Sequence, residues 1–229
     1  MLAARDLGLA GRLAGVSATL CPGEVTAICG PNGAGKSSLL TCLAGLLEPD
    51  AGEVALDGAA LSAMPAGTRA CAIGYLPQTP ELAWDVSVET LVSLGRIPWA
   101  GAPAGEAQAA VGEAIAAMDL EPLRHRPVSR LSGGERARAL MARVLATRPR
   151  WLLADEPLAN LDLAHAAALV VRLREQAARG AGVVLVLERG RITADGPPER
   201  ALAVDVIARV WGVEARWHGE AGHRALAIG

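Results

Sequence analysis

Residues 30–37, GPNGAGKS, decide the fold, because they fit the pattern G-x-x-x-x-G-K-[ST] of a phosphate-binding loop. Glycines in this pattern let successive backbone N–H groups point at phosphate oxygens without obstruction by side chains. A helix that starts near Gly35 adds the positive end of its dipole. Lys36 is predicted to reach the terminal phosphates, and the Ser37 hydroxyl is predicted to ligate Mg²⁺. The alternative, a glycine-rich turn with an incidental lysine, would match by accident in about one chain of this size in a hundred.

The residues on either side of this loop support the same interpretation. Residues 24–29 (EVTAIC) predict a short strand, and a helical pattern follows over 36–47 before the breaker residues 48–52. Of the 22 cationic residues, Lys36 is the only lysine. An ammonium is a compact point charge and a guanidinium a broad planar fork, so the two differ at such a site. The predicted nucleotide contacts of the loop are Gly30, Pro31, Asn32, Gly33, Ala34, Gly35, Lys36, Ser37 and Ser38.

Composition excludes several other classes of protein. The chain has 229 residues, of which 52% are hydrophobic, yet no stretch without a charged residue exceeds 11 residues. A membrane-spanning helix needs about 20 predominantly apolar residues, so no such helix is predicted. A formal net charge of −2 gives no basic field for nucleic acid. The four cysteines lack C-x-x-C spacing, which favours reduced thiols over zinc or disulfides.

Further patterns place the other elements. Short strands are predicted at 53–56, 70–76, 151–154 and 183–187. The middle of the chain, from about residue 80 to 146, is mostly helical by pattern. A helix is also predicted over 163–179, capped by Asp162 and stopped by Gly180.

Two carboxylates follow the apolar run at 151–154. Asp155 and Glu156 stand where this predicted strand ends, and ligands of parallel sheets bind at the carboxyl ends of strands. Asp155 can hold Mg²⁺ through water, and Glu156 can act as general base toward a water that attacks the terminal phosphate. The alternative is a pair of acidic residues marking the point where a strand meets solvent.

A second anion-binding element is predicted at 131–136 (LSGGER). Ser132 and Glu135 have the spacing of a capping box that opens a helix running through Ala146. A capping box alone does not need Gly133 and Gly134. A serine hydroxyl, bare glycine amides and a helix N-terminus together suit a phosphate group.

In chain order, GPNGAGKS, Gln78, LSGGE, WLLADEP and 158–162 (LANLD) resemble the nucleotide-binding subunit of ATP-binding cassette (ABC) transporters. The likeness covers essentially the whole chain. It implies ATP and Mg²⁺ as cofactors and a homodimer that sandwiches two ATP molecules head to tail. In that dimer Ser132, Gly133 and Gly134 would contact the γ-phosphate held by the partner's loop. The catalytic residues it implies are Glu156 and Gln78, and the metal ligands are Ser37, Gln78 and Asp155.

Residues 87–98 (SVETLVSLGRIP) are similar to the corresponding phrase in importers of metal chelates such as iron–siderophore, haem or cobalamin. The alternative is an ordinary amphipathic helix and turn. The resemblance implies a transmembrane permease, an indirect substrate-binding protein, and a peripheral place on the cytoplasmic face of the inner membrane. The permease would dock near residues 78–99, where Trp84 and Trp99 are interface anchors or core residues.

The sequence departs from the family pattern at two places. Residues 1–30 contain no aromatic side chain to stack on adenine, so the base is predicted to be held either less tightly or by aliphatic contacts and Arg12. After 183–187 the family continues with a His-Asp pair, a helix and a strand, whereas here Leu187 joins Glu188 directly. About 15–20 residues are missing by typical element lengths. Either the segment is lost, or 183–187 fuse two strands into one.

These observations predict a single α/β domain with a P-loop NTPase core. Its mixed, mainly parallel sheet is flanked by helices, with an inserted helical subdomain and an N-terminal antiparallel β region. Residues 1–79 and 147–229 form the predicted core lobe, and 80–146 the signature subdomain. The expected function is ATP hydrolysis for a metal-chelate importer, at a reduced rate because the histidine contact is missing. The alternatives are a nucleotide-binding module with impaired hydrolysis and a structural or regulatory role, or an ATPase for another substrate class.

Overall fold

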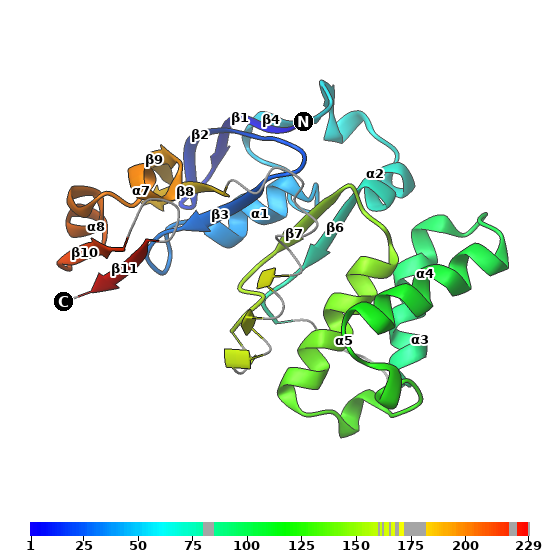
Figure 1. Ribbon diagram of the computed structural model, residues 1–229. Coiled ribbons are helices and arrows are strands. Elements are labelled where there is room, and N and C mark those ends of the chain that lie inside the picture. The colour runs from blue at the N-terminus through cyan, green and yellow to red at the C-terminus, as the bar shows by residue number, and fades with distance from the viewer. Residues whose placement is uncertain are drawn as a thin grey trace. The chain divides into compact units, whose positions relative to one another are not determined.

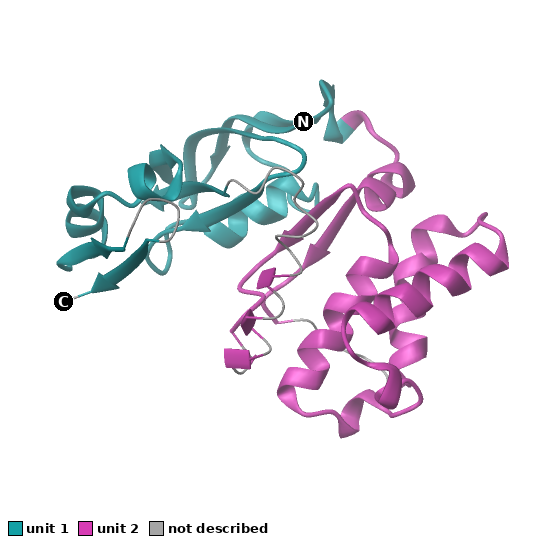
Figure 2. Cartoon of the chain, viewed as in Figure 1, with its two compact units in different colours: residues 1–62, 173–229 teal, residues 63–172 magenta. Residues whose placement is uncertain are grey.

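The structure, a computed structural model, contains two compact units (Figure 2). Unit 1 combines the two ends of the chain, residues 1–62 and 173–229, and unit 2 is residues 63–172. The residues described are 1–79, 85–159, 161, 163–164, 166–167, 170–171, 182–219 and 224–228. The predicted division into a core lobe and a signature subdomain stays a prediction.

Unit 1 begins with an antiparallel sheet, as the sequence predicts. Its strands are β1 (Leu2–Leu9), β2 (Leu13–Leu20), β4 (Ala51–Leu56) and β5 (Ala59–Ala60), in the order β2-β1-β4-β5. Apolar side chains at intervals along β1 and β2, such as Leu2, Leu7 and Val16, are fully buried. The predicted strand at 53–56 is confirmed and starts two residues earlier, at Ala51.

The second sheet of unit 1 positions the phosphate-binding loop. It consists of β3 (Val25–Cys29), β8 (Gly182–Glu188) and β9 (Arg191–Gly196), in the order β3-β8-β9. β3 and β8 are parallel, and β8 and β9 are antiparallel. This mixed sheet confirms both strand predictions and lies in the part of Figure 1 that also holds α1.

β8 is one uninterrupted strand with neighbours on both sides. Val184, Leu185 and Val186 pair with β3 on one side and with β9 on the other. At its end Glu188 pairs with Arg191 across a two-residue turn. Residues 183–187 therefore form a single strand that enters the β9 hairpin directly, and both explanations of the short connection stay open.

Helices cover one face of β8. These are α7 (Pro198–Ala201) and α8 (Val204–Trp211), and they are followed by the hairpin of β10 (Ala215–His218) and β11 (Ala225–Ile228). The buried cluster between helices and sheet consists of Val184, Val186, Ala201, Val206 and Val210. Burial of such apolar side chains at about 25 cal/mol per Å² holds the end of the chain on the sheet.

The helix after the loop, α1 (Lys36–Leu43), is shorter than the predicted 36–47. The apolar pattern continues through Leu47, but Gly45 adopts a positive φ of 67° and its N–H donates to the Cys42 carbonyl. A glycine in this conformation commonly ends a helix because it has no Cβ to clash there. The apolar pattern therefore extends beyond the end of the helix.

Unit 2 contains a two-stranded parallel sheet, β6 (Ile73–Leu76) and β7 (Trp151–Ala154), with Ile73 opposite Trp151 and Leu76 opposite Ala154. The prediction of a strand over the whole of 70–76 is wrong, because residues 70–72 end the helix α2 (Ala66–Ala72). Alanine has the best helix propensity, so this alanine-rich stretch continues the helix until Ile73. The strand predicted at 151–154 is confirmed.

The middle of the chain is helical, as predicted, over the residues described. Its main elements are α3 (Val88–Ser93), the 3-10 helix η2 (Leu94–Trp99), α4 (Ala104–Ala117) and α5 (Gly133–Ala146) (Figure 1). Two short turns, η3 (Glu121–Leu123) and η4 (Val128–Arg130), connect α4 to α5. Together these helices form the part of unit 2 that carries the LSGGE segment.

The helix predicted over 163–179 lies mostly outside the described residues. Residues 163–164, 166–167 and 170–171 are helical, whereas Asp162 and Gly180 belong to the part that is not described. Among the described helices, none is both long enough and apolar enough to span a bilayer.

Candidate nucleotide-binding site

The phosphate-binding loop lies between β3 and α1, and its backbone fits closely against neighbouring segments of unit 1. A Cβ atom on Gly30 would lie 2.1 Å from the Leu187 carbonyl oxygen of β8. A Cβ atom on Gly35 would lie 2.5 Å from the Arg12 carbonyl oxygen, in the β1–β2 turn. Both residues have positive φ, 152° and 101°. Glycine is therefore required at these two positions by the fold itself, besides any approach of a phosphate group.

Lys36 lies with its ammonium over the loop. Its Nζ donates to the Gly30 carbonyl at 2.8 Å and to the Pro31 carbonyl at 2.9 Å. An ammonium has three donors, so two are engaged by the loop and one remains for another acceptor. The arrangement places a positive charge where the first-turn amides of α1 also point, which suits an anion such as phosphate.

The two serines after Lys36 differ in exposure. Ser37 is exposed, whereas Ser38 is buried in the first turn of α1. The Thr41 hydroxyl donates to the backbone carbonyls of both serines, at 2.8 and 3.0 Å. The Ser37 hydroxyl is therefore accessible for the predicted metal, and the role of Ser38 stays a prediction.

A turn from the far end of the chain braces the loop. Arg189 and Gly190, the two residues between β8 and β9, have φ values of 49° and 76°, as a type I′ hairpin turn requires. The Gly190 N–H donates to the Ala34 carbonyl in the loop at 3.0 Å, and the Gly190 carbonyl accepts from Ala14 of β2 at 2.8 Å. Sequence reasoning missed this brace, although the Arg-Gly pair between two strand patterns was a signal for a tight turn.

Cys29 ends β3 directly before the loop. Burial raises the pKa of its thiol, while the positive charge of Lys36 acts in the opposite direction. The net shift is upward, so the thiol stays protonated at neutral pH. All four cysteines are free thiols, with Cys42 buried and the other three partly buried. The sequence predicts this reduced state.

Unit 2 brings together two of the predicted site residues. The Gln78 Nε2 atom donates to the Glu156 Oε2 atom at 2.7 Å. The parallel pairing of β6 and β7 ends at Leu76 and Ala154, and the Asp155 N–H donates to the Leu76 carbonyl at 2.9 Å. Because the two strands end at the same edge, the residues that follow them meet there. The sequence predicted both residues, but not their direct hydrogen bond.

The two carboxylates at this edge differ in their surroundings. Asp155 is only 6% exposed, whereas Glu156 is exposed and has a left-handed backbone with a φ of 48°. Such a conformation in a non-glycine residue costs on the order of 1 kcal/mol and is found at functional sites. The pKa of Tyr75, on β6, is raised by burial and further by the negative charge of Asp155. Tyr75 therefore stays neutral beside this carboxylate.

The LSGGE segment is an N-terminal helix cap in which Gly133 faces open space. The Ser132 Oγ accepts from the Glu135 N–H at 3.3 Å, and the Glu135 Oε2 accepts from the Ser132 N–H at 2.8 Å. This confirms the capping box and the helix through Ala146. Ser132 and Gly133 are exposed, and a Cβ atom on Gly133 would meet no atom within 4 Å. The fold around Gly133 therefore leaves room for a ligand.

The cap makes acid sensitivity a testable property of α5. Hydrogen bonds from Ser132 lower the pKa of Glu135, with a smaller contribution from Arg126. A carboxyl whose folded pKa is lowered adds stability above its unfolded pKa of about 4.3 and loses it as the pH falls through the folded value. A Glu135→Gln variant keeps an acceptor but no charge, so its thermal midpoint is expected to fall less between pH 5 and pH 3. Equal losses in both chains would contradict this.

Other predicted residues are distributed as follows. His125 and His218 are exposed, whereas His165 and His223 lie outside the described residues. Asn160 and Asp162 of the LANLD segment also lie outside them. The Arg12 side chain is exposed in the β1–β2 turn, and its contact with adenine stays a prediction.

Comparison with known proteins adds to this geometry. The sequence profile of the family described as "ABC transporter" matches residues 13–159. A hemin import ATP-binding protein of Streptomyces coelicolor is 43% identical, with 87% of this chain and 77% of that protein covered. One of Gloeobacter violaceus is also 43% identical, with 93% and 82% covered. The alignment with the Streptomyces protein is 217 residues long, which is longer than the 87% of this 229-residue chain that it covers. The Streptomyces protein therefore has residues within the aligned region that this chain lacks.

Solved structures agree on the fold. A chain of a metal-chelate type ABC transporter in an inward-facing conformation has a TM-score of 0.80 at 21% identity, covering 100% of this chain and 96% of its own. The CbiO1 component of the CbiONQ transporter complex of Clostridium perfringens has a TM-score of 0.76 at 27% identity, with 91% and 92% covered.

A glycine-rich loop between a parallel strand and a helix, together with carboxylates after another strand, defines an ATP-binding domain of the P-loop class. Within the P-loop class, the LSGGE cap is the feature that this chain shares with the ABC transporter family. The chain belongs to the ABC transporter family, and it is an ATPase subunit of that family.

Proposed function

We propose that this chain hydrolyses ATP to drive an importer of a metal chelate, with haem as the favoured cargo. The observation that carries the proposal is the presence in one chain of the phosphate-binding loop, the Gln78–Glu156 hydrogen bond and the LSGGE cap, together with relatives named for hemin import at 43% identity. The phosphate loop binds the phosphates of ATP through Lys36 and the amides that begin α1. The cargo itself is recognised by partner proteins.

The donor set of this chain fits Mg²⁺. Hard oxygen donors suit this ion, and the proposed ligands are the exposed Ser37 hydroxyl, the Gln78 side-chain oxygen and, through water, the Asp155 carboxylate. The Gln78 amide nitrogen already donates to Glu156, which leaves its oxygen for the metal. When bound there, Mg²⁺ would neutralise negative charge on the phosphates of ATP.

Glu156 is the proposed general base. Its exposed carboxylate is held at one oxygen by Gln78, so the other oxygen can accept a proton from a water molecule. Gln78 orients the Glu156 carboxylate through this hydrogen bond. Lys36 stabilises the charge that accumulates on the transferred phosphate.

The proposed partners follow from the exposed elements. A second copy of the chain would place Ser132, Gly133 and Gly134 on the γ-phosphate at the partner's loop, where the free amides of α5 suit an anion. A transmembrane permease would hold the dimer at the cytoplasmic face of the inner membrane, as a peripheral subunit. A substrate-binding protein would deliver the chelate on the other side.

The permease is proposed to dock on the helical part of unit 2. Ile97 is 67% exposed and Trp99 is 37% exposed, and both lie on η2. Trp99 also donates its indole N–H to the Thr147 carbonyl at 2.8 Å. Its ring is therefore attached to unit 2 and still partly exposed to a partner. Trp84 lies outside the described residues.

The expected hydrolysis rate is low. β8 runs directly into the β9 hairpin, and no histidine lies between His165 and His218 to contact the γ-phosphate. The impaired-hydrolysis alternative rests on the same observation. Turnover under single-turnover conditions separates the two, because an ATPase releases phosphate from its bound ATP and a purely structural module does not.

Replacing Glu156 by glutamine tests the proposed base. The variant is expected to release phosphate about 100-fold more slowly, because a positioned general base contributes about 10²–10⁴ to the rate. Its Kd for ATP is expected to stay within threefold, since the phosphate loop is untouched. Phosphate release after rapid mixing and a nucleotide titration measure the two quantities. Glu53→Gln, an exposed carboxylate of β4 that pairs with Arg5, is the control. Equal rates for Glu156→Gln and the parent chain would refute the role.

A further inference from the structure

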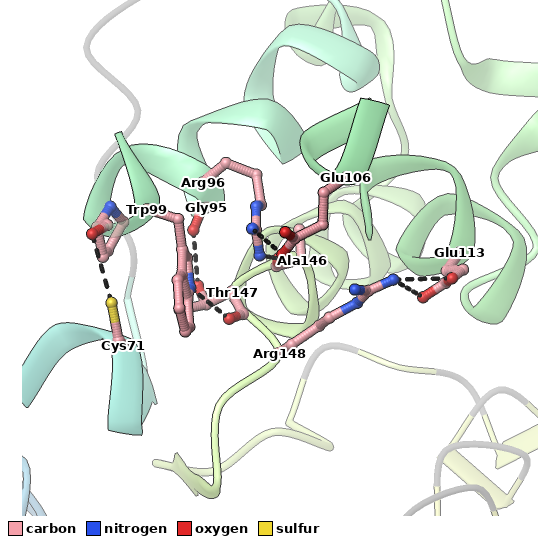
Figure 3. A network of polar contacts seen from close by, with 10 residues as sticks. Cys71, Gly95, Arg96, Trp99, Glu106, Glu113, Ala146, Thr147 and Arg148 are labelled. Atoms are coloured by element: carbon pink, nitrogen blue, oxygen red, sulfur yellow. Dashed lines mark hydrogen bonds and ion pairs between the residues drawn. The ribbon is translucent and has the colours of Figure 1, made fainter. Parts of the chain in front are cut away.

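The 3-10 helix η2 is joined to the C-terminal end of α5 by a dense set of polar contacts (Figure 3). Arg96, only 7% exposed, donates from Nη1 to the Ala146 carbonyl at 3.1 Å and from Nη2 to Glu106 of α4 at 3.2 Å. The Thr147 hydroxyl donates to the Gly95 carbonyl at 2.9 Å. A cation at the C-terminal carbonyls of a helix is favourable because the helix dipole is negative there.

Backbone contact is as close as these hydrogen bonds suggest. A Cβ atom on Gly95 would lie 2.0 Å from the Arg143 carbonyl oxygen of α5, so η2 rests on the helix without a side chain between them. The Arg96 guanidinium lies 5.2 Å from the centroid of the Trp99 ring, a cation–π distance. The indole of Trp99 in turn donates to Thr147. Residues 95–99 therefore hold the last turn of α5 from several directions.

The same junction reaches the strand that leads to Gln78. The Cys71 thiol of α2 donates to the Pro98 carbonyl of η2 at 3.4 Å, and α2 runs directly into β6. A Cβ atom on Gly74 of β6 would lie 2.7 Å from the Val144 side chain of α5. Three elements thus meet without spare volume: η2, the end of α5, and the α2–β6 segment.

We propose that residues 95–99 are a clamp that fixes the orientation of α5, and thereby of the signature residues at its other end, with Arg96 as the positioning residue. α5 is 14 residues long, so its ends are about 21 Å apart at 1.5 Å per residue. Without this attachment α5 would be free to tilt, and a tilt would displace Ser132 and Gly133 at its other end. The exposed Ile97 belongs to the same segment, so a partner that binds there acts on α5 and β6 together.

The proposal rests on the proposed ATP-driven dimer, and it is tested in a Glu156→Gln background that traps bound ATP. Arg96→Met removes the guanidinium donors and keeps an unbranched apolar stem. With MgATP as the probe, sedimentation equilibrium is expected to show a dimer dissociation constant raised at least tenfold. The Kd for ATP binding to the monomer is expected to stay within twofold, because the loop belongs to unit 1. If Arg96 only stabilised the fold, Arg96→Met would lower the thermal midpoint but would not raise the dimer dissociation constant relative to the Kd for ATP.

Matched variants make the outcome specific. Arg148→Gln removes an exposed ion pair with Glu113 near the same end of α5 and is expected to leave dimerisation unchanged. Trp99→Phe removes the indole donor but keeps an aromatic ring, and it is expected to weaken dimerisation severalfold in a chain that still folds. Arg96→Lys keeps a charge but lacks the fork that reaches both Ala146 and Glu106, so it is expected to restore little. Dimerisation of Arg96→Met as tight as that of Arg148→Gln would overturn the clamp.

A failure of the dimer itself is distinguishable. If the parent chain binds MgATP and remains monomeric, the proposed dimer is wrong. The clamp is then judged by amide hydrogen exchange over residues 131–138 in the monomer. Exchange at least tenfold faster in Arg96→Met than in Arg148→Gln supports the clamp, and equal exchange refutes it.

Discussion

Replacing Lys36 by alanine is expected to weaken ATP binding about 100-fold or more. A hydrogen bond between charged groups contributes about 1.5–3 kcal/mol, and a tenfold change in Kd equals about 1.4 kcal/mol. Lys36 is placed to make such bonds to the phosphates, because its ammonium already lies over the Gly30 and Pro31 carbonyls. Isothermal titration with MgATP measures the loss.

Two controls separate phosphate recognition from other effects of this change. Lys36→Arg keeps the charge, and it is expected to bind ATP poorly as well, because a planar fork does not fit a position held by two loop carbonyls. Arg5→Ala removes an exposed cation of β1 that pairs with Glu53, and it is expected to bind ATP normally. Thermal unfolding of each variant shows whether the loop still folds. Lys36→Ala with a Kd within threefold of the parent chain would contradict the assignment.

Replacing Gly30 by alanine is expected to destabilise unit 1 by about 3 kcal/mol or more and to abolish ATP binding. The new Cβ would lie 2.1 Å from the Leu187 carbonyl oxygen, which belongs to the backbone of a central strand and cannot swing away. Either β8 or the loop must move, and changes of this size are among the most damaging single substitutions. Denaturant unfolding and a nucleotide titration measure the two effects.

Gly33 offers a matched control in the same loop. Its φ of 78° is unfavourable for alanine, but a Cβ atom there would meet nothing within 4 Å. Gly33→Ala therefore carries the conformational cost alone, about 1–2 kcal/mol. The difference between the two variants isolates the clash with Leu187. Equal destabilisation by Gly30→Ala and Gly33→Ala would show that β8 does not constrain the loop.

Features encoded within a few neighbouring residues were predictable from the sequence. The loop at 30–37, the capping box of Ser132 and Glu135, and the strand at 151–154 each follow from local spacing and local chemistry. Each is recognisable from the sequence because the residues that define it are close together in the chain. Glu156 could be singled out by the same logic, since it is the second residue after the strand at 151–154.

Features that depend on competing or distant interactions were not predictable. The helix after Lys36 ends at Leu43 because Gly45 takes a left-handed conformation, although the apolar pattern continues. The brace between Gly190 and Ala34 joins residues far apart in the chain, and no local pattern specifies which turn meets which loop. The hydrogen bond between Gln78 and Glu156 likewise requires the register of two strands.

Unit 1 is assembled from both ends of the chain, and this has a kinetic consequence. β3 pairs with β8 across roughly 160 residues of sequence, and such long-range pairing is slow because the loop must close before any contact stabilises it. At a synthesis rate of 5–20 residues per second, β3 waits roughly 8–30 s for β8 to emerge from the ribosome. Unit 2 is complete before then and can fold first. ATP binding is therefore expected to be gained late in synthesis. The final quarter of the chain must be made before the phosphate-binding loop in the first quarter can bind ATP.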